Sequence, residues 1–338
     1  MDLEIPRPTP LLGSWLTAGQ LGMIHAPAGV GKSWFAYGLG LAVAGGADFL
    51  GWTGHAPRQV LYVDGEMSQW DIQGRMRMLT ANLTPEQREH ARRNFALVGR
   101  DMLGADADKF PILNSAADPH RKSLDTLIRE DRPAVVILDN LSCLTAMEDE
   151  NSAAEWGEVI SWVLKQRISG RTVIQVQHNR KGGTIPGQRD EAYRGSTRQE
   201  APLSWRISLS PGRGGGGTSF GITFPKRRGD PSDTAPRTAT VADGGWTVEV
   251  EDPGAELAEY MAAVVGLMTT PTPAEAKARL RNKPSLLAAL KESTGEEFTK
   301  QTMNTLIAGA VRAGLMEKSV ADVWAKVGNP TFGAAPAF

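Results

Sequence analysis

A short glycine-rich run followed by a lysine and a serine is the part of this sequence best suited to chemistry. The run is Gly29-Val30-Gly31-Lys32-Ser33. Glycines let the backbone curl until successive N–H groups point at phosphate oxygens, and the start of a helix adds partial positive charge. In such a loop the lysine reaches the β- and γ-phosphates and the serine hydroxyl ligates Mg²⁺. The segment from Ala28 to Trp34 is therefore predicted to bind ATP, with Ser33 on the metal.

One position departs from the usual pattern of this loop. The pattern G-x-x-x-x-G-K-[ST] has glycine where this chain has Ala26. Alanine is tolerable there if its φ stays negative, because only a positive φ requires glycine. The alternative is a chance Gly-Lys-Ser after a strand. An apolar run before the loop and a small-residue helix after it, Phe35 to Ala44, favour a nucleotide site.

Two acidic residues end predicted strands and could complete a catalytic site. Asp139 follows the apolar run 134–138, which is typical of a strand covered on both faces, and it could hold the Mg²⁺ shell. Glu66 follows the strand 59–63 and could take a proton from an attacking water. Either could instead be an ordinary turn or capping residue, and Asp64 competes with Glu66 for the role of base. The upstream phosphate loop favours the metal and catalytic roles.

Polar and basic residues end two further predicted strands. Gln177 and His178 end one of them, where a polar pair could sense γ-phosphate and pass the signal to the Gly-rich stretch 181–190. That stretch could equally be an ordinary solvated loop. The run Lys226-Arg227-Arg228 ends a later strand. It is either a solvated strand edge or a set of cations that reaches a neighbouring subunit's γ-phosphate, as an arginine finger in trans.

The order of predicted elements indicates how these residues could meet. Strands and helices alternate from residue 20 to residue 195, which is typical of a parallel sheet between layers of helices. Short strands with turn residues between them predict an antiparallel extension over 203–209, 218–224, 236–241 and 246–250. The helix 68–82 is expected to bury one face made of Trp70, Ile72, Met76 and Leu79.

The chain divides into four predicted segments. Residues 1–19 are an N-terminal arm, and residues 20–252 are the α/β domain with the phosphate loop. Residues 253–327 predict helices and a small β-wing, hence a winged-helix-like domain, and residues 328–338 a loose tail rich in Gly, Pro and Ala. This second domain has a basic stretch that is either a phosphate contact or a solvated helix face: Lys277, Arg279, Arg281 and Lys283.

Composition narrows the class of protein. The 338-residue chain has 22% charged residues and a formal charge of −1, so any binding to nucleic acid must come from local patches. A single cysteine, Cys143, excludes an internal disulfide, fits a reducing cytoplasm and is expected in the core. No apolar run approaches the roughly 18 residues of a membrane span, and the N-terminus lacks the basic start of a signal peptide. A cytoplasmic protein that is neither secreted nor membrane-bound is expected.

Taken together, the motifs resemble those of the RecA-like ATPases. The resemblance is closest to the plasmid RepA replicative helicase family and more distant to DnaB-type helicases. Besides the phosphate loop, the motifs in that family's order and spacing are 63–66 (Val-Asp-Gly-Glu), 136–140 (Val-Ile-Leu-Asp-Asn), 177–178 (Gln-His) and 193–196 (Tyr-Arg-Gly-Ser). The acidic stretch 148–152 is also similar to the family's segment after the Walker B aspartate. The resemblance covers residues 10–250 and implies a RecA-like core.

The resemblance implies a role for each matched residue. Lys32 and Ser33 bind nucleotide and Mg²⁺, Glu66 is the catalytic base, and Asp139 is the Walker B acid. Gln177 and His178 couple hydrolysis to DNA. The candidate finger residues supplied by a neighbouring subunit are Arg206, Lys226 and Arg228.

The resemblance also implies an assembly. RepA-type proteins form rings of six, so a homo-oligomer, as a hexameric ring, is expected. Two departures are visible: Gln177-His178 stands where RepA has a His pair, closer to the Gln of DnaB-type proteins, and the C-terminal helical domain is an addition to the compact RepA plan. An unaided helicase function does not follow from the match.

Three functions remain in competition. The leading hypothesis is an oligomeric Mg²⁺-dependent ATPase acting on single-stranded DNA, as a plasmid- or phage-type replicative helicase or helicase loader. The second is an ATP-gated recombination mediator or regulator that binds DNA without unwinding it. The third makes the C-terminal domain a docking module for a replication or recombination protein. Fold analogy does not choose among them.

Overall fold

In the structure, a computed structural model, the chain folds into two compact units, Met1–Glu251 and Asp252–Phe338. The structure describes residues 7–110, 113, 119–145, 153–178, 201–212, 218–228, 233–242, 245–250, 260, 262–267, 283–295, 297–312 and 315–316. The predicted loop 181–190, the motif 193–196, the acidic stretch 148–152 and the cations at 277, 279 and 281 lie outside these residues.

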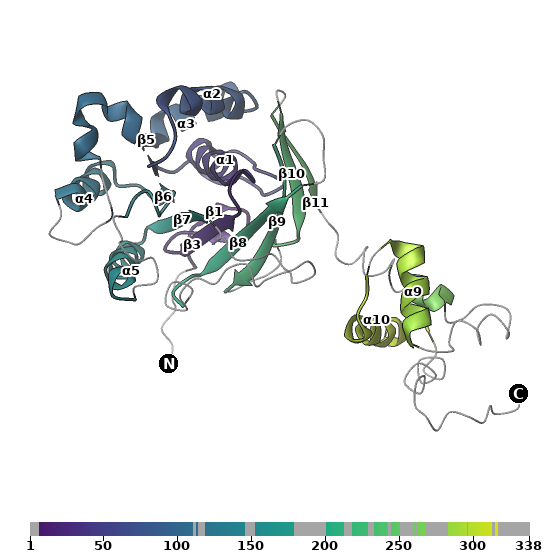
Figure 1. Cartoon of the computed structure of the whole chain (residues 1–338). Coiled ribbons are helices and arrows are strands. Elements are labelled where there is room, and N and C mark those ends of the chain that lie inside the picture. Colours follow the sequence, from purple (N-terminus) through teal and green to yellow (C-terminus); the bar gives the residue numbers. More distant parts are fainter. Residues whose placement is uncertain are drawn as a thin grey trace, which may run out of the picture. The chain divides into compact units, whose positions relative to one another are not determined.

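One sheet of nine strands organises the first unit, in the order β11-β10-β9-β8-β3-β7-β6-β4-β5 (Figure 1). The parallel part consists of β8 (Trp205–Pro211), β3 (Leu21–Ala26), β7 (Thr172–His178), β6 (Val135–Asp139), β4 (Val60–Asp64) and β5 (Phe95–Gly99). The antiparallel part adds β9 (Thr218–Arg227), β10 (Arg237–Ala242) and β11 (Gly245–Val250). This confirms the predicted α/β class with a mainly parallel sheet and an antiparallel C-terminal extension. The first strand predicted for that extension, 203–209, is different, because it corresponds to β8, which runs parallel to β3 and antiparallel to β9.

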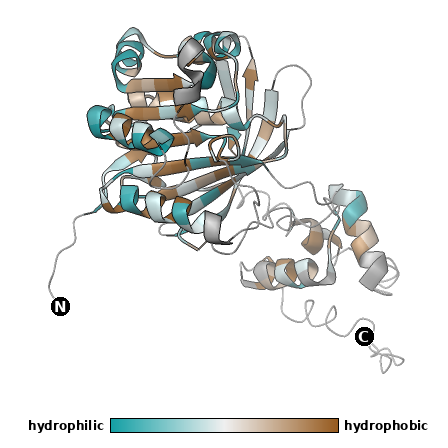
Figure 2. Cartoon of the chain, turned by 60° about the vertical axis from the view of Figure 1, so that its left-hand side comes forward, coloured by the Kyte–Doolittle hydropathy of each residue, from teal (hydrophilic) through white to brown (hydrophobic). Residues whose placement is uncertain are grey.

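Helices cover both faces of the parallel strands. Successive strand residues point to opposite faces, and both sets are apolar, so each face has to be covered. One face packs against α1 (Lys32–Gly45), α2 (Gln69–Thr80) and α3 (Pro85–Asn94). The other packs against α4 (Pro119–Asp131) and α5 (Ala153–Ile168), with the 3-10 helix η1 (Arg100–Lys109) following β5. Figure 2 shows largely brown strands in the sheet and teal segments on the helices that cover it. None of the described helices is long and apolar enough to cross a membrane.

The end of the predicted N-terminal arm differs from expectation. Residues 10–17 form a small antiparallel pair, β1 (Pro10–Leu12) and β2 (Leu16–Thr17). Trp15, between the two strands, is fully buried against the rings of Trp52, Trp205 and Phe224. The burial of these large rings ties residues 10–17 to the core of the first unit.

Two residues that were expected in the core lie at the surface. Trp70 in α2 is 80% exposed, whereas Ile72 and Leu79 are buried. Residues two apart on a helix point in nearly opposite directions, so the first turn of α2 cannot bury both Trp70 and Ile72. Cys143 is also exposed. It lies in the turn after β6, where its neighbours Leu141 and Leu144 fill the core instead.

The second unit has its own small apolar core. Its described helices α9 (Lys283–Thr294) and α10 (Lys300–Arg312) bury Leu290, Met303, Leu306 and Ile307. Of the predicted β-wing the structure describes only residues 315–316. The winged-helix-like domain therefore stays a prediction, as does the basic stretch, of which only Lys283 falls in a described helix.

A candidate nucleotide site at the carboxyl edge of the sheet

Four parallel strands end at the same edge of the sheet and bring the candidate residues together. The register pairs Asp64 at the end of β4 with Asp139 at the end of β6, and Ala26 at the end of β3 with His178 at the end of β7. Loops that follow the carboxyl ends of parallel strands are the usual place for a ligand in an open α/β sheet.

The phosphate loop joins β3 to α1 at this edge. Gly29 has a φ of +79° and Gly31 a φ of +120°, conformations that favour glycine. A Cβ at Gly31 would come within 2.7 Å of the Phe220 ring, whereas a Cβ at Gly29 would meet nothing within 4 Å. Ala26 is not among the residues with positive φ, so alanine fits at the position where the pattern has glycine.

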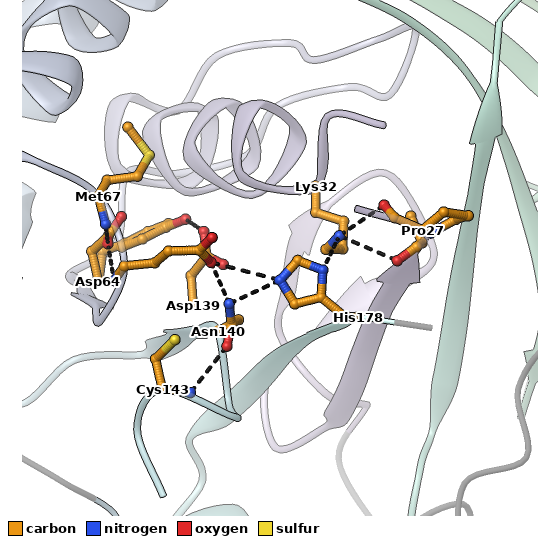
Figure 3. A network of polar contacts seen from close by, with 11 residues as sticks. Pro27, Lys32, Asp64, Met67, Asp139, Asn140, Cys143 and His178 are labelled. Carbon is orange, nitrogen blue, oxygen red and sulfur yellow. Dashed lines mark hydrogen bonds and ion pairs between the residues drawn. The ribbon is translucent and has the colours of Figure 1, made fainter. Parts of the chain in front are cut away.

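Lys32, the first residue of α1, folds back over the loop. Its Nζ donates to the carbonyl oxygens of Ala26 at 3.2 Å and Pro27 at 3.0 Å, and to Nδ1 of His178 at 3.0 Å (Figure 3). Burial lowers the pKa of Lys32, and the negative charges of Asp139 and Glu66 oppose that shift. The ammonium is thus held where the loop, β7 and the acidic residues converge.

Asp139 is buried behind the loop. Its Oδ2 accepts a hydrogen bond from the Tyr62 hydroxyl at 2.5 Å, and its side chain also bonds to Ser33. Burial raises the pKa of Asp139 to about 6, the Tyr62 bond acts in the opposite direction, and the nearby charge of Asp64 raises it further. The structure thereby joins Ser33 and Asp139, the two predicted metal ligands.

Glu66 lies in the turn after β4 and faces the end of β7. Its Oε2 accepts a hydrogen bond from Nδ2 of Asn140 and lies 3.6 Å from Nε2 of His178. Asn140 is fixed in turn, because its Oδ1 accepts the Cys143 N–H at 3.0 Å. About half of the Glu66 side chain is exposed to solvent, 54%. It is therefore both oriented and reachable by water.

The ring of His178 links Lys32 to Glu66. Lysine has donors only, so Nδ1 accepts from Lys32, and we assign the ring proton to Nε2. Nε2 lies 3.1 Å from Nδ2 of Asn140, which donates to Glu66, so the Glu66 carboxylate is the acceptor that Nε2 faces. One imidazole thus touches the phosphate-loop lysine and faces the candidate base.

Asp64, the rival candidate for the base, is occupied by structural bonds. Its Oδ1 accepts the backbone N–H groups of Glu66 at 2.9 Å and Met67 at 2.7 Å, and its Oδ2 accepts the Tyr37 hydroxyl at 2.8 Å. The residue is 1% exposed. This bonding favours Glu66 as the base and gives Asp64 the task of holding the turn that carries it.

The remaining candidates lie elsewhere. Gln177 is buried, and because strand residues alternate it faces away from His178. Arg206 pairs with Met23 early in β3, and Lys226 pairs with Arg206, so both lie toward the amino edge of the parallel strands. Arg228 lies there too and donates to the Ala201 carbonyl at 2.5 Å. The structure does not bring these cations to the phosphate loop of their own chain.

Several residues at the site were given no role in the sequence analysis. They are Asn140, the two tyrosines Tyr37 and Tyr62, and Arg75, whose guanidinium lies 4.8 Å from the ring of Trp34. A tyrosine in an otherwise aliphatic strand is a weak signal of a buried hydroxyl that needs a partner. Asn140 directly follows the Walker B acid, which was a usable hint.

The residues present fit a nucleotide with Mg²⁺. The first turn of α1 has no acidic residue, so its N–H groups are free of a competing side-chain carboxylate. Among the described residues no group of three or more His, Cys, Asp or Glu could hold a metal ion. A Mg²⁺ at Ser33 and Asp139 would therefore complete its shell with phosphate oxygens and water, as this ion ordinarily does.

Known proteins share parts of this chain. The AAA domain family matches residues 1–184, more than half of the chain. Flagellar accessory protein FlaH from Methanocaldococcus jannaschii aligns at 16% identity with a TM-score of 0.46, over 69% of this chain and 91% of that one. A KaiC-like protein from Pyrococcus horikoshii aligns at 14% identity with a TM-score of 0.47, over 72% and 99%. By its match to more than half of the sequence, the chain belongs to the AAA domain family of P-loop ATPases.

Proposed function

We propose that the protein is an oligomeric Mg²⁺-dependent ATPase that acts on single-stranded DNA, as a plasmid- or phage-type replicative helicase or helicase loader. The observation that best supports ATPase activity is the convergence of Lys32, Glu66 and Asp139 at one sheet edge, with His178 between Lys32 and Glu66. The resemblance of the motifs to RepA-type helicases supports the action on DNA. The position of His178 at the end of β7 supports a link from the site to the residues that follow.

In the proposed mechanism each residue has one task. Lys32 and the N–H groups of the loop would bind the phosphates. Ser33 and Asp139 would hold Mg²⁺, which would neutralise phosphate charge. Glu66 orients the attacking water and accepts its proton, with Asn140 holding the carboxylate at Oε2. Solvent reaches Glu66, while Asp139 stays buried, so the two carboxylates are suited to different roles.

His178 is the proposed link between hydrolysis and movement. All three donors of Lys32 have acceptors, and His178 Nδ1 is the acceptor that belongs to a different strand. A γ-phosphate oxygen competes with these acceptors for Lys32. His178 then exchanges partners as phosphate binds and leaves, and the end of β7 follows it. Gln177, which precedes His178 in the chain, transmits this movement of β7 to the opposite face of the sheet.

Subunit contacts complete the proposed site. Arg206, Lys226 and Arg228 lie toward the amino edge, away from their own phosphate loop. We place one of them at the γ-phosphate of a neighbouring subunit in a ring, where an arginine stabilises transition-state charge. This role is supported by the resemblance to ring-forming helicases.

Steady-state ATPase activity tests the proposal. We expect hydrolysis that single-stranded DNA stimulates, that rises per subunit as concentration spans assembly, and that is absent from Lys32→Ala. A strand-displacement assay on a tailed duplex then separates a helicase from a loader, which hydrolyses ATP but needs a partner helicase to unwind. Slow hydrolysis that is indifferent to DNA, with no unwinding, would instead favour the ATP-gated mediator or regulator.

A further inference from the structure

Two buried tyrosines lie stacked directly behind the candidate site. Tyr37 comes from α1, one turn beyond Ser33, and Tyr62 comes from β4. Their ring centroids are 4.0 Å apart with an interplanar angle of 15°, and both residues are fully buried. The phosphate-loop helix is thus fastened to the strand that leads to Glu66 by a ring stack.

Each hydroxyl at this stack holds one carboxylate on a different element. Tyr37 of α1 donates to Oδ2 of Asp64 in β4, at 2.8 Å. Tyr62 of β4 donates to Oδ2 of Asp139 in β6, at 2.5 Å. The two tyrosines therefore link α1 to β4 and β4 to β6. Asp64 and Asp139 are themselves register neighbours at the ends of β4 and β6.

The two bonds lead to different parts of the site. Beyond Tyr37, the second oxygen of Asp64 accepts the backbone N–H groups of Glu66 and Met67, which fixes the turn that presents Glu66. Beyond Tyr62, Asp139 bonds to Ser33, which joins the two candidate metal ligands. One tyrosine bears on the base and the other on the metal.

We propose that Tyr37 and Tyr62 are positioning residues, Tyr37 setting the Glu66 turn for hydrolysis and Tyr62 setting Asp139 for Mg²⁺. The proposal rests on the proposed ATPase function. Burial, together with the neighbouring carboxylates, raises the pKa of each tyrosine well above its usual value, so both hydroxyls keep their protons and remain donors at neutral pH. Partners of this kind orient ligating and catalytic carboxylates in many sites.

Phenylalanine substitutions separate positioning from packing. Tyr37→Phe and Tyr62→Phe keep the stacked rings and remove only the hydroxyls. Tyr260→Phe, in the second unit, is the matched control, since its ring also packs edge-on against an aromatic partner, Phe298. Unfolding temperature is measured for all three, so that activity losses can be compared with changes in stability.

The two variants are expected to fail in different ways. Tyr62→Phe should raise the Mg²⁺ concentration for half-maximal ATPase on the order of tenfold, and should equally raise the Mg²⁺ needed for equilibrium binding of a fluorescent ATP analogue. Tyr37→Phe should lower kcat on the order of tenfold and leave KM and both Mg²⁺ dependences unchanged. Tyr260→Phe should match wild type in kcat, KM and both Mg²⁺ dependences.

The outcomes keep this inference apart from the proposed function. If wild type hydrolyses ATP and Lys32→Ala does not, the ATPase stands. The positioning roles are then wrong if both tyrosine variants match wild type, or if their losses are equal in kind and follow the unfolding temperature. If wild type binds the analogue but hydrolyses nothing, the function fails, and the Mg²⁺ dependence of binding still tests Tyr62.

Discussion

The two edges of the parallel strands both carry charged residues, but they differ in what those residues bond. At the carboxyl edge, side chains bond across elements: Lys32 to His178 and Tyr62 to Asp139. At the amino edge, arginines hold backbone carbonyls of their own chain, Arg228 that of Ala201 and Arg227 that of Trp15. A site that one chain forms alone can be described from the contacts within that chain. For a residue that acts in the site of a neighbouring subunit, the single chain shows only its position.

The largest expected effect tests whether the amino edge is a true second half of the site. Arg228→Ala should lower kcat about 10³-fold if Arg228 is the finger, because such an arginine stabilises transition-state charge. Mixing this variant with Lys32→Ala should restore part of the activity, since each supplies what the other lacks. Arg206→Ala and Lys226→Ala tested in the same way identify which cation acts.

Arg227→Ala is the matched control for that experiment. Arg227 is adjacent in sequence, and its guanidinium donates to the carbonyl oxygens of Trp15 at 2.8 Å and Ser14 at 3.4 Å within its own chain. Its loss should affect the unfolding temperature and should not be rescued by mixing. Absence of rescue for all three candidate cations at every mixing ratio would remove the trans role from the amino edge.

A second, smaller effect sharpens the assignment at the carboxyl edge. Glu66→Gln should bind ATP as wild type does and lose roughly 10²-fold or more in kcat, because the amide cannot accept the proton of water. Asp64→Asn is the comparison, since Asp64 holds the turn through two N–H groups. Normal hydrolysis by Glu66→Gln, with ATP turnover lost in Asp64→Asn, would make Asp64 the base.

The smallest effect is on stability and reports the burial of the carboxyl edge. An acid whose pKa is raised by folding contributes stability that is present below its ordinary value near 4 and is lost as pH rises through about 6, the pKa of Asp139. Asp139→Asn removes that pH dependence. We expect the nucleotide-free variant to be more stable than wild type at pH 8 by about 3 kcal/mol, with the difference shrinking toward pH 4. Urea unfolding at both pH values measures it, and an unchanged difference would mean that Asp139 is not the group that titrates.

Local signals in the sequence were enough for the sheet and for part of the site. A short stretch of sequence is enough to recognise the phosphate loop, the strand ends at Asp64 and Asp139, or the alternation of helices and strands. The bond of Tyr62 to Asp139 spans 77 residues and exists only because β4 and β6 lie side by side in register. Trp70 was misplaced because its helical phase is opposite to that of Ile72.

The position of Trp34 makes the chain its own optical reporter. This indole follows Ser33 on the first turn of α1 and lies under the Arg75 guanidinium, at 4.8 Å. Four other tryptophans, Trp15, Trp52, Trp162 and Trp205, are almost wholly shielded from solvent. Trp70, in contrast, is 80% exposed. Occupancy of the phosphate loop should change the emission of Trp34, which adjoins the loop, and a Trp34→Phe difference spectrum would isolate its contribution from that of Trp70 without any label on the nucleotide.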